Sequence, residues 1–307
     1  MKGMIKMKHL LKMLDLTKEH IIGILNLADQ LKYEQKRGIP HKHLAGKTLG
    51  MIFEKSSTRT RVSFEVGMYQ LGGHALFLSS QELQMGRGEP IEDTARVLSR
   101  YLDGIMIRTF KQSVVEDLAK YGSIPVINGL TDSSHPCQVL ADLMTIREHK
   151  NKLEGLKLCF IGDGNNMANS LIIGCLKVGM KVSVATPEGY EPSKVALTFA
   201  SDYGDMFELV REPLVAAKDA DVLVTDVWSS MGQEGEAEKR KKDFAGFCID
   251  NEIMAFAKPD AIVQHCLPAH KGEEITEEVF EAHATAIFDE AENRLHAQKA
   301  VMVKLMG

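Results

Sequence analysis

The chain has 307 residues, 44% of them hydrophobic and 26% charged, a composition typical of a globular protein long enough for two domains of roughly 150 residues each. Its 37 basic and 42 acidic residues give a net charge of −5, which excludes the overall basic surface of a nucleic-acid-binding protein. No apolar run approaches the roughly 20 residues of a membrane helix, and lysines interrupt the N-terminal stretch where a signal peptide needs its apolar core.

The five cysteines are odd in number and widely spaced, which indicates reduced thiols rather than a disulfide framework. We therefore expect a cytoplasmic protein with neither a membrane nor a nucleic acid as partner. The basic run Lys239–Lys242 lies among acidic residues, and we interpret it as a solvated face or loop.

Short apolar runs alternate with helical stretches along the whole chain. The runs predicted as strands in the first half are Thr48–Phe53, His74–Leu78, Gly104–Ile107 and Pro125–Ile127. Those in the second half are Lys157–Ile161, Lys181–Ala185, Val222–Thr225, Ile262–Gln264 and Ala286–Phe288. This alternation is typical of βαβ units and predicts an α/β protein of two domains, each a parallel β-sheet flanked by helices.

We place the domain boundary at the polar stretch that follows the predicted helix Cys137–Arg147. This gives a first domain of residues 1–148 and a second of residues 149–289. A C-terminal helix, about residues 290–307, is expected to pack back onto the first domain. In parallel sheets ligands bind beyond the carboxyl ends of the strands, and polar clusters follow most of the predicted strands, so we expect the active site in the cleft between the domains.

The segment Ser56–Arg61 places four hydroxyl residues around two arginines at a predicted strand-to-helix junction. A Ser or Thr can cap the helix, and its exposed N–H groups and dipole attract an anion. Arg59 adds a planar fork that suits bidentate contact with a phosphate. An ordinary helix cap followed by surface arginines is the alternative, and the combination favours an oxyanion ligand.

Further polar residues follow later strands. Arg108 comes directly after one strand, while His135 and Gln138 share one face at the start of a helix, where both can donate to a carbonyl oxygen. A structural histidine and a surface arginine are the alternatives.

The turn Gly162–Met167 is only superficially similar to a dinucleotide-binding turn, because Met167 stands where the third glycine belongs. A nucleotide-dependent oxidoreductase is therefore a weak alternative. Asp226 ends another strand and suits an ammonium group. Cys266 beside His265 leaves a metal ligand or a nucleophile open, although close ligand spacing and an identifiable base are missing.

Four segments, taken in this order, resemble the ornithine carbamoyltransferases of the aspartate/ornithine carbamoyltransferase family. They are Ser57–Arg61, His135–Gln138, Asp226–Gly232 and His265–Pro268. The first two are shared with the wider family, whereas the last two point to ornithine. The resemblance covers nearly the whole chain and implies transfer of the carbamoyl group of carbamoyl phosphate to the δ-amine of L-ornithine, giving L-citrulline and phosphate.

The resemblance also implies roles for single residues. Those matching carbamoyl phosphate contacts are Ser57, Thr58, Arg59, Thr60, Gln84, Arg108, His135, Pro136, Cys137, Gln138, Cys266, Leu267 and Arg294. Those expected to act in catalysis are Arg59, Arg108, His135 and Cys266. Those matching ornithine contacts are Asn166, Asp226, Ser230 and Met231. A cis peptide bond is expected between Leu267 and Pro268.

Gln84 matches a residue that reaches the site of a neighbouring subunit, so a homotrimer or a multiple of trimers is implied. No metal or organic cofactor is expected. Ser56 departs from the family, since many members carry Pro there, and this leaves the stiffness of the phosphate loop open. The remaining alternatives are a sister enzyme acting on aspartate, putrescine or an acylated ornithine, and a non-enzymatic anion or amino-acid binding protein.

Overall fold

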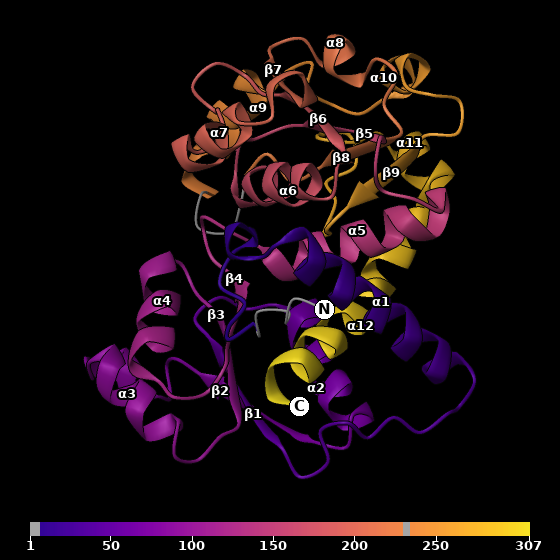
Figure 1. The fold of residues 1–307 in the computed structure, drawn as a ribbon. Helices are drawn as coiled ribbons and strands as arrows, with labels where there is room; N and C mark the ends of the chain where they lie inside the picture. The colour runs from indigo at the N-terminus through magenta and orange to yellow at the C-terminus, as the bar shows by residue number, and fades with distance from the viewer. Residues whose placement is uncertain (1–6, 230–233) are drawn as a thin grey trace. The chain divides into compact units, whose positions relative to one another are not determined.

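The computed structural model describes residues 7–229 and 234–307, and these form two compact units (Figure 1). Unit 1 contains the chain up to Ala141 together with Arg294–Gly307, and unit 2 contains Asp142–Asn293. Both passages between the units occur inside helices, namely α5 (Pro136–Lys150) and α12 (Ala284–Met306).

Unit 1 is built on a four-stranded parallel sheet with the strand order β2-β1-β3-β4. The strands are β1 (Thr48–Phe53), β2 (His74–Ser79), β3 (Gly104–Arg108) and β4 (Val126–Leu130). β3 is buried along its whole length, as expected for an inner strand covered on both faces. β2 lies at the edge and is largely exposed.

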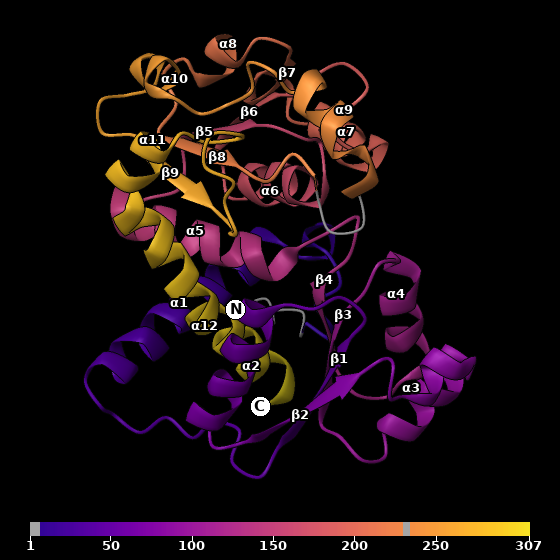
Figure 2. The same cartoon turned by 180° about the vertical axis from the view of Figure 1, so that it is seen from behind.

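Helices cover both faces of this sheet. They are α1 (Lys18–Lys36), α2 (Thr58–Gln70), α3 (Ile91–Leu98) and α4 (Gln112–Tyr121), with 3-10 turns at Met13–Asp15 and Gln84–Arg87. Figures 1 and 2 show α3 and α4 on one face, and α1, α2 and the C-terminal part of α12 on the other. Ile105 and Ile107 pack with Val115 and Leu118 of α4 in the core between sheet and helices.

Unit 2 is built on a five-stranded parallel sheet with the order β7-β6-β5-β8-β9. The strands are β5 (Lys157–Ile161), β6 (Lys181–Ala185), β7 (Phe207–Val210), β8 (Val222–Thr225) and β9 (Ile262–His265). The helices are α6 (Asn166–Lys177), α7 (Lys194–Ser201), α8 (Pro213–Ala217), α9 (Ala237–Asp243), α10 (Asn251–Phe256) and α11 (Glu277–Ala282), with 3-10 turns at Gly204–Met206 and Glu234–Glu236.

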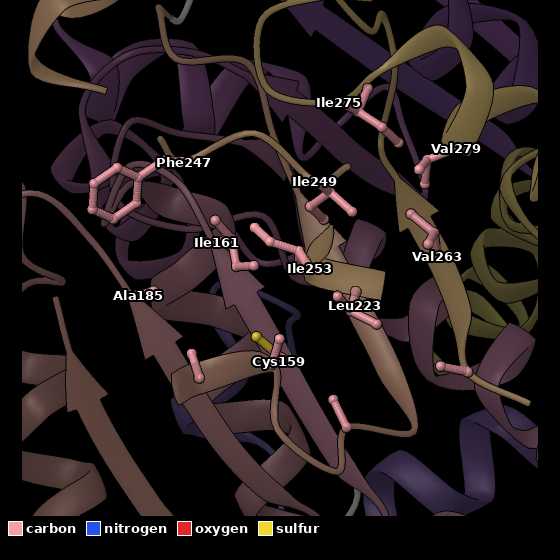
Figure 3. Close-up of a cluster of buried hydrophobic side chains, with 14 of the residues drawn as sticks. Cys159, Ile161, Ala185, Leu223, Phe247, Ile249, Ile253, Val263, Ile275 and Val279 are labelled. Carbon is pink, nitrogen blue, oxygen red and sulfur yellow. The ribbon is translucent and has the colours of Figure 1, made fainter. Parts of the chain in front are cut away.

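Alternate residues of the strands point into the hydrophobic core of unit 2. Cys159, Ile161, Leu223 and Val263 point from the sheet toward apolar side chains that include Ile253 of α10 (Figure 3). The opposite face of the sheet is covered by α6 and α7. Each sheet is therefore enclosed by helices, which confirms the predicted class of two parallel-sheet α/β domains.

Eight of the nine predicted strands are present, with ends that differ by up to three residues. The prediction for Ala286–Phe288 is wrong, because this run lies in α12. Three apolar residues cannot separate a strand from a buried helical turn, and the flanking alanines and glutamates favour a helix. β7, a short edge strand, was not predicted from the sequence, because its exposed Glu208 interrupts the apolar run. No helix among the described residues is long and apolar enough to cross a membrane.

Candidate active site

In unit 1, polar residues gather where the parallel strands end. The loop after β1 leads into the N-terminus of α2, Arg108 ends β3, and His135 follows β4 at the start of α5. Because parallel strands present their carboxyl ends along one edge of the sheet, these segments lie together, as the sequence predicted.

Ser57 caps α2. Its backbone is extended and its hydroxyl accepts a hydrogen bond from the backbone N–H of Thr60 at 3.2 Å. Thr58 is exposed and Arg59 is half-buried in the first turn. No acidic residue occupies this turn, so the positive end of the helix dipole is not neutralised by the helix itself.

Thr60 is fully buried, and its hydroxyl oxygen is the meeting point of several donors. Arg294 of α12 contacts it at 2.9 Å, Arg108 at 3.5 Å, and the Ser57 hydroxyl at 3.0 Å. Both guanidinium groups belong to residues that are less than one-tenth exposed. We call Ser57, Thr60, Arg108, His135 and Arg294 the Thr60 cluster. It concentrates two cations in a region of low dielectric, which suits an anionic ligand.

His135 is buried in this cluster, and its pKa is lowered well below the ordinary value of 6.5. Burial is the main cause, and the positive charges of Arg294 and Arg108 add to it. The imidazole is therefore neutral at pH 7. A neutral ring carries one N–H, which can donate to a carbonyl oxygen without adding a third positive charge.

The first turn of α5 supports His135. Pro136 begins the helix, and Gln138 is fully buried one turn along. The Cys137 thiol donates to the backbone oxygen of Asn128 at 3.3 Å, and burial raises its pKa to about 12. The Cys137 side chain is thus neutral and engaged within the fold.

Gln84 begins the 3-10 turn after β2, and it is exposed. Its backbone oxygen accepts the N–H of Glu89. The prediction that it reaches the site of a neighbouring subunit stays a prediction.

In unit 2, Asp226 follows β8 and collects donors from two other strand ends. The Asn165 side-chain amide donates to Oδ2 at 2.8 Å. The Cys266 thiol donates to Oδ1 at 3.2 Å, and the backbone N–H of Val227 donates to the same oxygen at 2.8 Å. We call Asn165, Asp226 and Cys266 the Asp226 cluster. Its carboxylate, fixed on both oxygens, suits an ammonium group.

Asn165 was not among the residues predicted to contact ornithine. Its side-chain oxygen caps α6 by accepting the N–H groups of Met167 and Ala168, while its amide nitrogen holds Asp226. The signal in the sequence was its position directly before a helix, where Asn is a preferred cap. Asn166, the residue predicted to contact ornithine, is the first residue of α6 and is nine-tenths buried.

Cys266 is a neutral thiol. Burial raises its pKa well above 9, and the nearby carboxylates of Asp226 and Glu290 raise it further. A thiol in this state donates a hydrogen bond and is a poor nucleophile or base. Leu267 follows in the left-handed region with φ of 59°, and the Leu267–Pro268 bond is cis, as the resemblance implied.

The loop after Asp226 is anchored by Arg240 of α9. Its guanidinium donates to Asp163 at 2.7 Å and to the backbone oxygen of Trp228 at 2.8 Å. The interpretation of Lys239–Lys242 as a wholly solvated face is wrong at Arg240, which is buried because Asp163 and Tyr190 line its side chain. Ser230 and Met231, predicted to contact ornithine, lie outside the described residues.

The dinucleotide alternative fits poorly with the loop Gly162–Asn165. The Asn165 side chain takes the N–H groups of α6 that a pyrophosphate would need, and Asp163 is used by Arg240. A methyl group at Gly164 would lie 2.3 Å from the backbone of Glu191 and Pro192, so this glycine is required by packing within the loop.

Within residues 7–229 and 234–307, one group has the spacing of a metal site: His270, Glu273 and Glu274. Both of its carboxylates already have partners. Glu273 pairs with Lys241 at 3.0 Å, and Oε1 of Glu274 accepts hydrogen bonds from His265 and from the backbone N–H of His270. The group therefore fits a set of structural contacts better than a cation site.

Comparisons with known proteins indicate one family for both halves of the chain. Residues 8–148 match the family model described as aspartate/ornithine carbamoyltransferase, carbamoyl-P binding domain, and residues 154–305 match the model for its Asp/Orn binding domain. The chain is 58% identical over 297 residues to a protein of Thermococcus kodakarensis named ornithine carbamoyltransferase, a match that covers 95% of this chain and 94% of the relative.

Solved structures give the same result. An ornithine carbamoyltransferase from Pyrococcus furiosus has a TM-score of 0.93 and 55% identity, covering 98% of this chain and 97% of that one. An anabolic ornithine carbamoyltransferase from Campylobacter jejuni has a TM-score of 0.91 and 47% identity, covering 96% and 98%. The chain belongs to the aspartate/ornithine carbamoyltransferase family.

Proposed function

We propose that the chain is an ornithine carbamoyltransferase, which transfers the carbamoyl group of carbamoyl phosphate to the δ-amine of L-ornithine and releases L-citrulline and phosphate. The observation that carries the proposal is the Thr60 cluster, where two buried guanidinium groups converge at the N-terminus of α2 beside a neutral histidine. The family membership, at 53–58% identity to relatives of this name, supports the acceptor.

The Thr60 cluster suits carbamoyl phosphate on grounds of charge. The N–H groups of the first turn of α2 and the fork of Arg59 bind the phosphate. Arg108 and Arg294 balance its negative charge, and His135 donates its single N–H to the carbamoyl oxygen.

The Asp226 cluster suits the α-amino group of ornithine. Its carboxylate is held in place by Asn165 and Cys266, so it is oriented before the substrate arrives. Asn166, Ser230 and Met231 are proposed to contact the rest of the amino acid, and an active site in the cleft between the domains stays a prediction.

The reaction is an acyl-type transfer. The neutral δ-amine attacks the carbamoyl carbon and forms a C–N bond, and the oxyanion of the tetrahedral intermediate is stabilised by Arg108, His135 and the Thr60 hydroxyl. The C–O bond to phosphate then breaks, and the phosphate takes up the proton that the amine loses. Cys266 is a poor base because its thiol stays protonated, so the departing phosphate is the proposed proton acceptor. The chemistry needs no metal or organic cofactor, and positioning of the two substrates supplies much of the rate.

A homotrimer, or a multiple of trimers, is proposed for the assembly. Unit 1 exposes large apolar side chains on two adjacent elements: Val62, Val66 and Tyr69 of α2, and Leu76 and Phe77 of β2. An exposed apolar surface of this kind is typical of a protein–protein interface. Gln84 lies five residues beyond the end of β2, so a neighbour bound to this surface would lie near it. Light scattering of the purified chain measures the number of subunits.

The test of the function is a citrulline assay with purified protein and a panel of acceptors: ornithine, putrescine, N-acetylornithine and aspartate. We expect turnover with ornithine at least a hundredfold above that with any other amine. Arg59→Ala serves as the background control, because it removes the fork at the phosphate and should lose nearly all activity. Preference for another amine would assign the chain to a sister enzyme, and no carbamoyl transfer at all would refute the proposal.

A further inference from the structure

Unit 2 contains a pair of fully buried residues, His265 and Glu274, for which the proposed reaction gives no role. The imidazole Nε2 of His265 lies 3.0 Å from Oε1 of Glu274, and both side chains have no exposed surface. His265 ends β9 and directly precedes Cys266 and Leu267, the residues predicted to complete the carbamoyl site.

The hydrogen bonds define which ring nitrogen carries the proton. Nδ1 of His265 accepts the backbone N–H of Leu267 at 2.9 Å, so Nδ1 acts as an acceptor and holds no proton. The proton is therefore on Nε2, where it is donated to Glu274. The same oxygen of Glu274 also accepts the backbone N–H of His270 at 2.6 Å, which fixes the carboxylate in turn.

This arrangement controls a backbone segment rather than a reacting atom. Leu267 has a φ of 59°, in the left-handed region that a non-glycine residue keeps only where its surroundings maintain it. The hydrogen bond from its N–H to His265 is such a restraint. At the other end of the segment, the backbone N–H of His265 donates to Oε2 of Glu290 at 3.0 Å.

We propose that His265 and Glu274 form a positioning pair, in which Glu274 fixes the Nε2–H tautomer of His265 and His265 holds Leu267 in the conformation that presents Cys266 and Leu267 to the carbamoyl group. The inference rests on the proposed function, since it assigns a role in that reaction. A carboxylate that fixes a histidine tautomer is a recurrent device in active sites and metal sites. Here the fixed imidazole acts on the main chain.

Two substitutions at one position separate this role from others. In His265→Asn the side-chain oxygen stands near the place of Nδ1 and still accepts the N–H of Leu267, while the contact with Glu274 is lost. In His265→Gln the amide nitrogen stands near the place of Nε2 and still donates to Glu274, while Leu267 loses its acceptor. Both changes remove a titratable ring, and both leave a buried amide of similar size.

We expect His265→Asn to keep kcat within about tenfold of the wild type and His265→Gln to lose at least a hundredfold, with KM for ornithine changed less than threefold in both. Glu274→Gln should also stay within about tenfold, because its amide oxygen can still accept from Nε2–H. Melting temperatures of the variants are measured alongside. A purely structural role would lower kcat in proportion to lost stability, without the difference between Asn and Gln, and would overturn the proposal.

Equal loss in His265→Asn and His265→Gln, together with loss of one limb of the pH profile of kcat, would show that the ring itself transfers a proton and would also overturn it. An independent readout uses the wild type: the 15N spectrum of labelled histidine should show His265 as a neutral ring protonated on Nε2, and a proton on Nδ1 would contradict the proposal. This spectrum needs no turnover. A wild type that makes no citrulline would therefore refute the function while leaving the pair testable.

Discussion

The Thr60 cluster and the Asp226 cluster are built in opposite ways. In the first, two guanidinium groups from distant parts of the chain meet at one hydroxyl oxygen, and a histidine beside them is kept neutral. In the second, a carboxylate receives an amide, a thiol and a backbone N–H. One cluster collects positive charge for an anion, and the other orients negative charge for a cation.

This difference in charge explains how one chain can bind two substrates at different places, because each cluster suits a group of opposite charge. Removing a group from the Thr60 cluster should affect the use of carbamoyl phosphate, whereas removing one from the Asp226 cluster should affect the use of ornithine. Single substitutions test whether a change in one cluster alters the kinetics of one substrate and leaves those of the other unchanged.

After Arg59→Ala, the largest effect is expected for Arg108→Ala. This residue ends β3 and donates to Thr60, and its loss removes a cation that stabilises the developing oxyanion. Loss of one such donor typically costs about 10²- to 10³-fold in rate, so kcat/KM for carbamoyl phosphate should fall by that factor. Steady-state kinetics with each substrate varied measure it. Arg96→Ala, at an exposed arginine paired with Asp93, is the control and should behave as the wild type. If only the KM for ornithine changed, Arg108 would not belong to the carbamoyl phosphate site, and the assignment of the two clusters would be wrong.

Asp226→Asn comes next. The amide keeps the shape of the side chain but loses its charge, and a hydrogen bond to a charged group contributes about 2 kcal/mol. KM for ornithine should therefore rise about 30-fold, with KM for carbamoyl phosphate nearly unchanged. Asp202→Asn, at the exposed end of α7, serves as the matched control. An equal rise in both KM values would mean that Asp226 does not discriminate between the substrates.

A third prediction concerns the stability of the fold in acid. Because the pKa of His135 lies well below 6.5 in the folded protein, the unfolded chain binds a proton below pH 6.5 that the folded chain does not. Stability that is present above pH 6.5 is thus lost as the pH falls, by about 1.4 kcal/mol between pH 7.5 and 5.5 for this one group.

Urea unfolding across this range measures that loss in the wild type and in His135→Asn. The variant should show a shallower fall, and His43→Asn, at an exposed histidine, should follow the wild type. Identical slopes for His135→Asn and the wild type would mean that folding does not change the proton affinity of His135.

The smallest effect is expected for Cys266→Ser. Since the thiol is neutral and donates to Asp226, a hydroxyl can replace it, and kcat should fall by less than about tenfold. Iodoacetamide should also react slowly with Cys266 at pH 8, because little thiolate is present. A loss above a thousandfold would instead identify Cys266 as a nucleophile or base.

Much of the fold follows from local patterns. Buried inner strands such as β3 and β5 are continuous apolar runs that end at polar residues, so both their position and the location of the site at their carboxyl ends could be predicted. The edge strand β7 could not, because Glu208 interrupts it and half of its surroundings are solvent. The run Ala286–Phe288 was assigned wrongly because its burial comes from helical packing that a three-residue pattern does not reveal.

The site shows the same division. Asp226 stands directly after a strand and Arg59 lies in the first turn of the helix that follows one, so both could be singled out from the residues around them. Arg294 could be named only through the family resemblance, since 234 residues separate it from Thr60. Arg240 was not predicted, because it acts through a hydrogen bond to Asp163, which is remote in sequence. Glu274 was not predicted either, because its partner His265 is buried beside a turn. Tertiary partnerships of this kind leave no local signal.

The two passages between unit 1 and unit 2 have a practical consequence for dissecting the molecule. Both run through continuous helix, α5 at Ala141–Asp142 and α12 at Asn293–Arg294, so neither offers the exposed loop that a protease prefers. Limited digestion should therefore spare both junctions. Expressing either unit alone would end the chain in mid-helix and remove intrahelical hydrogen bonds from the same turns that present Gln138 and Arg294. Unit 1 alone would thus lose order next to two residues of its proposed site, and the intact chain is the smallest piece in which its chemistry can be studied.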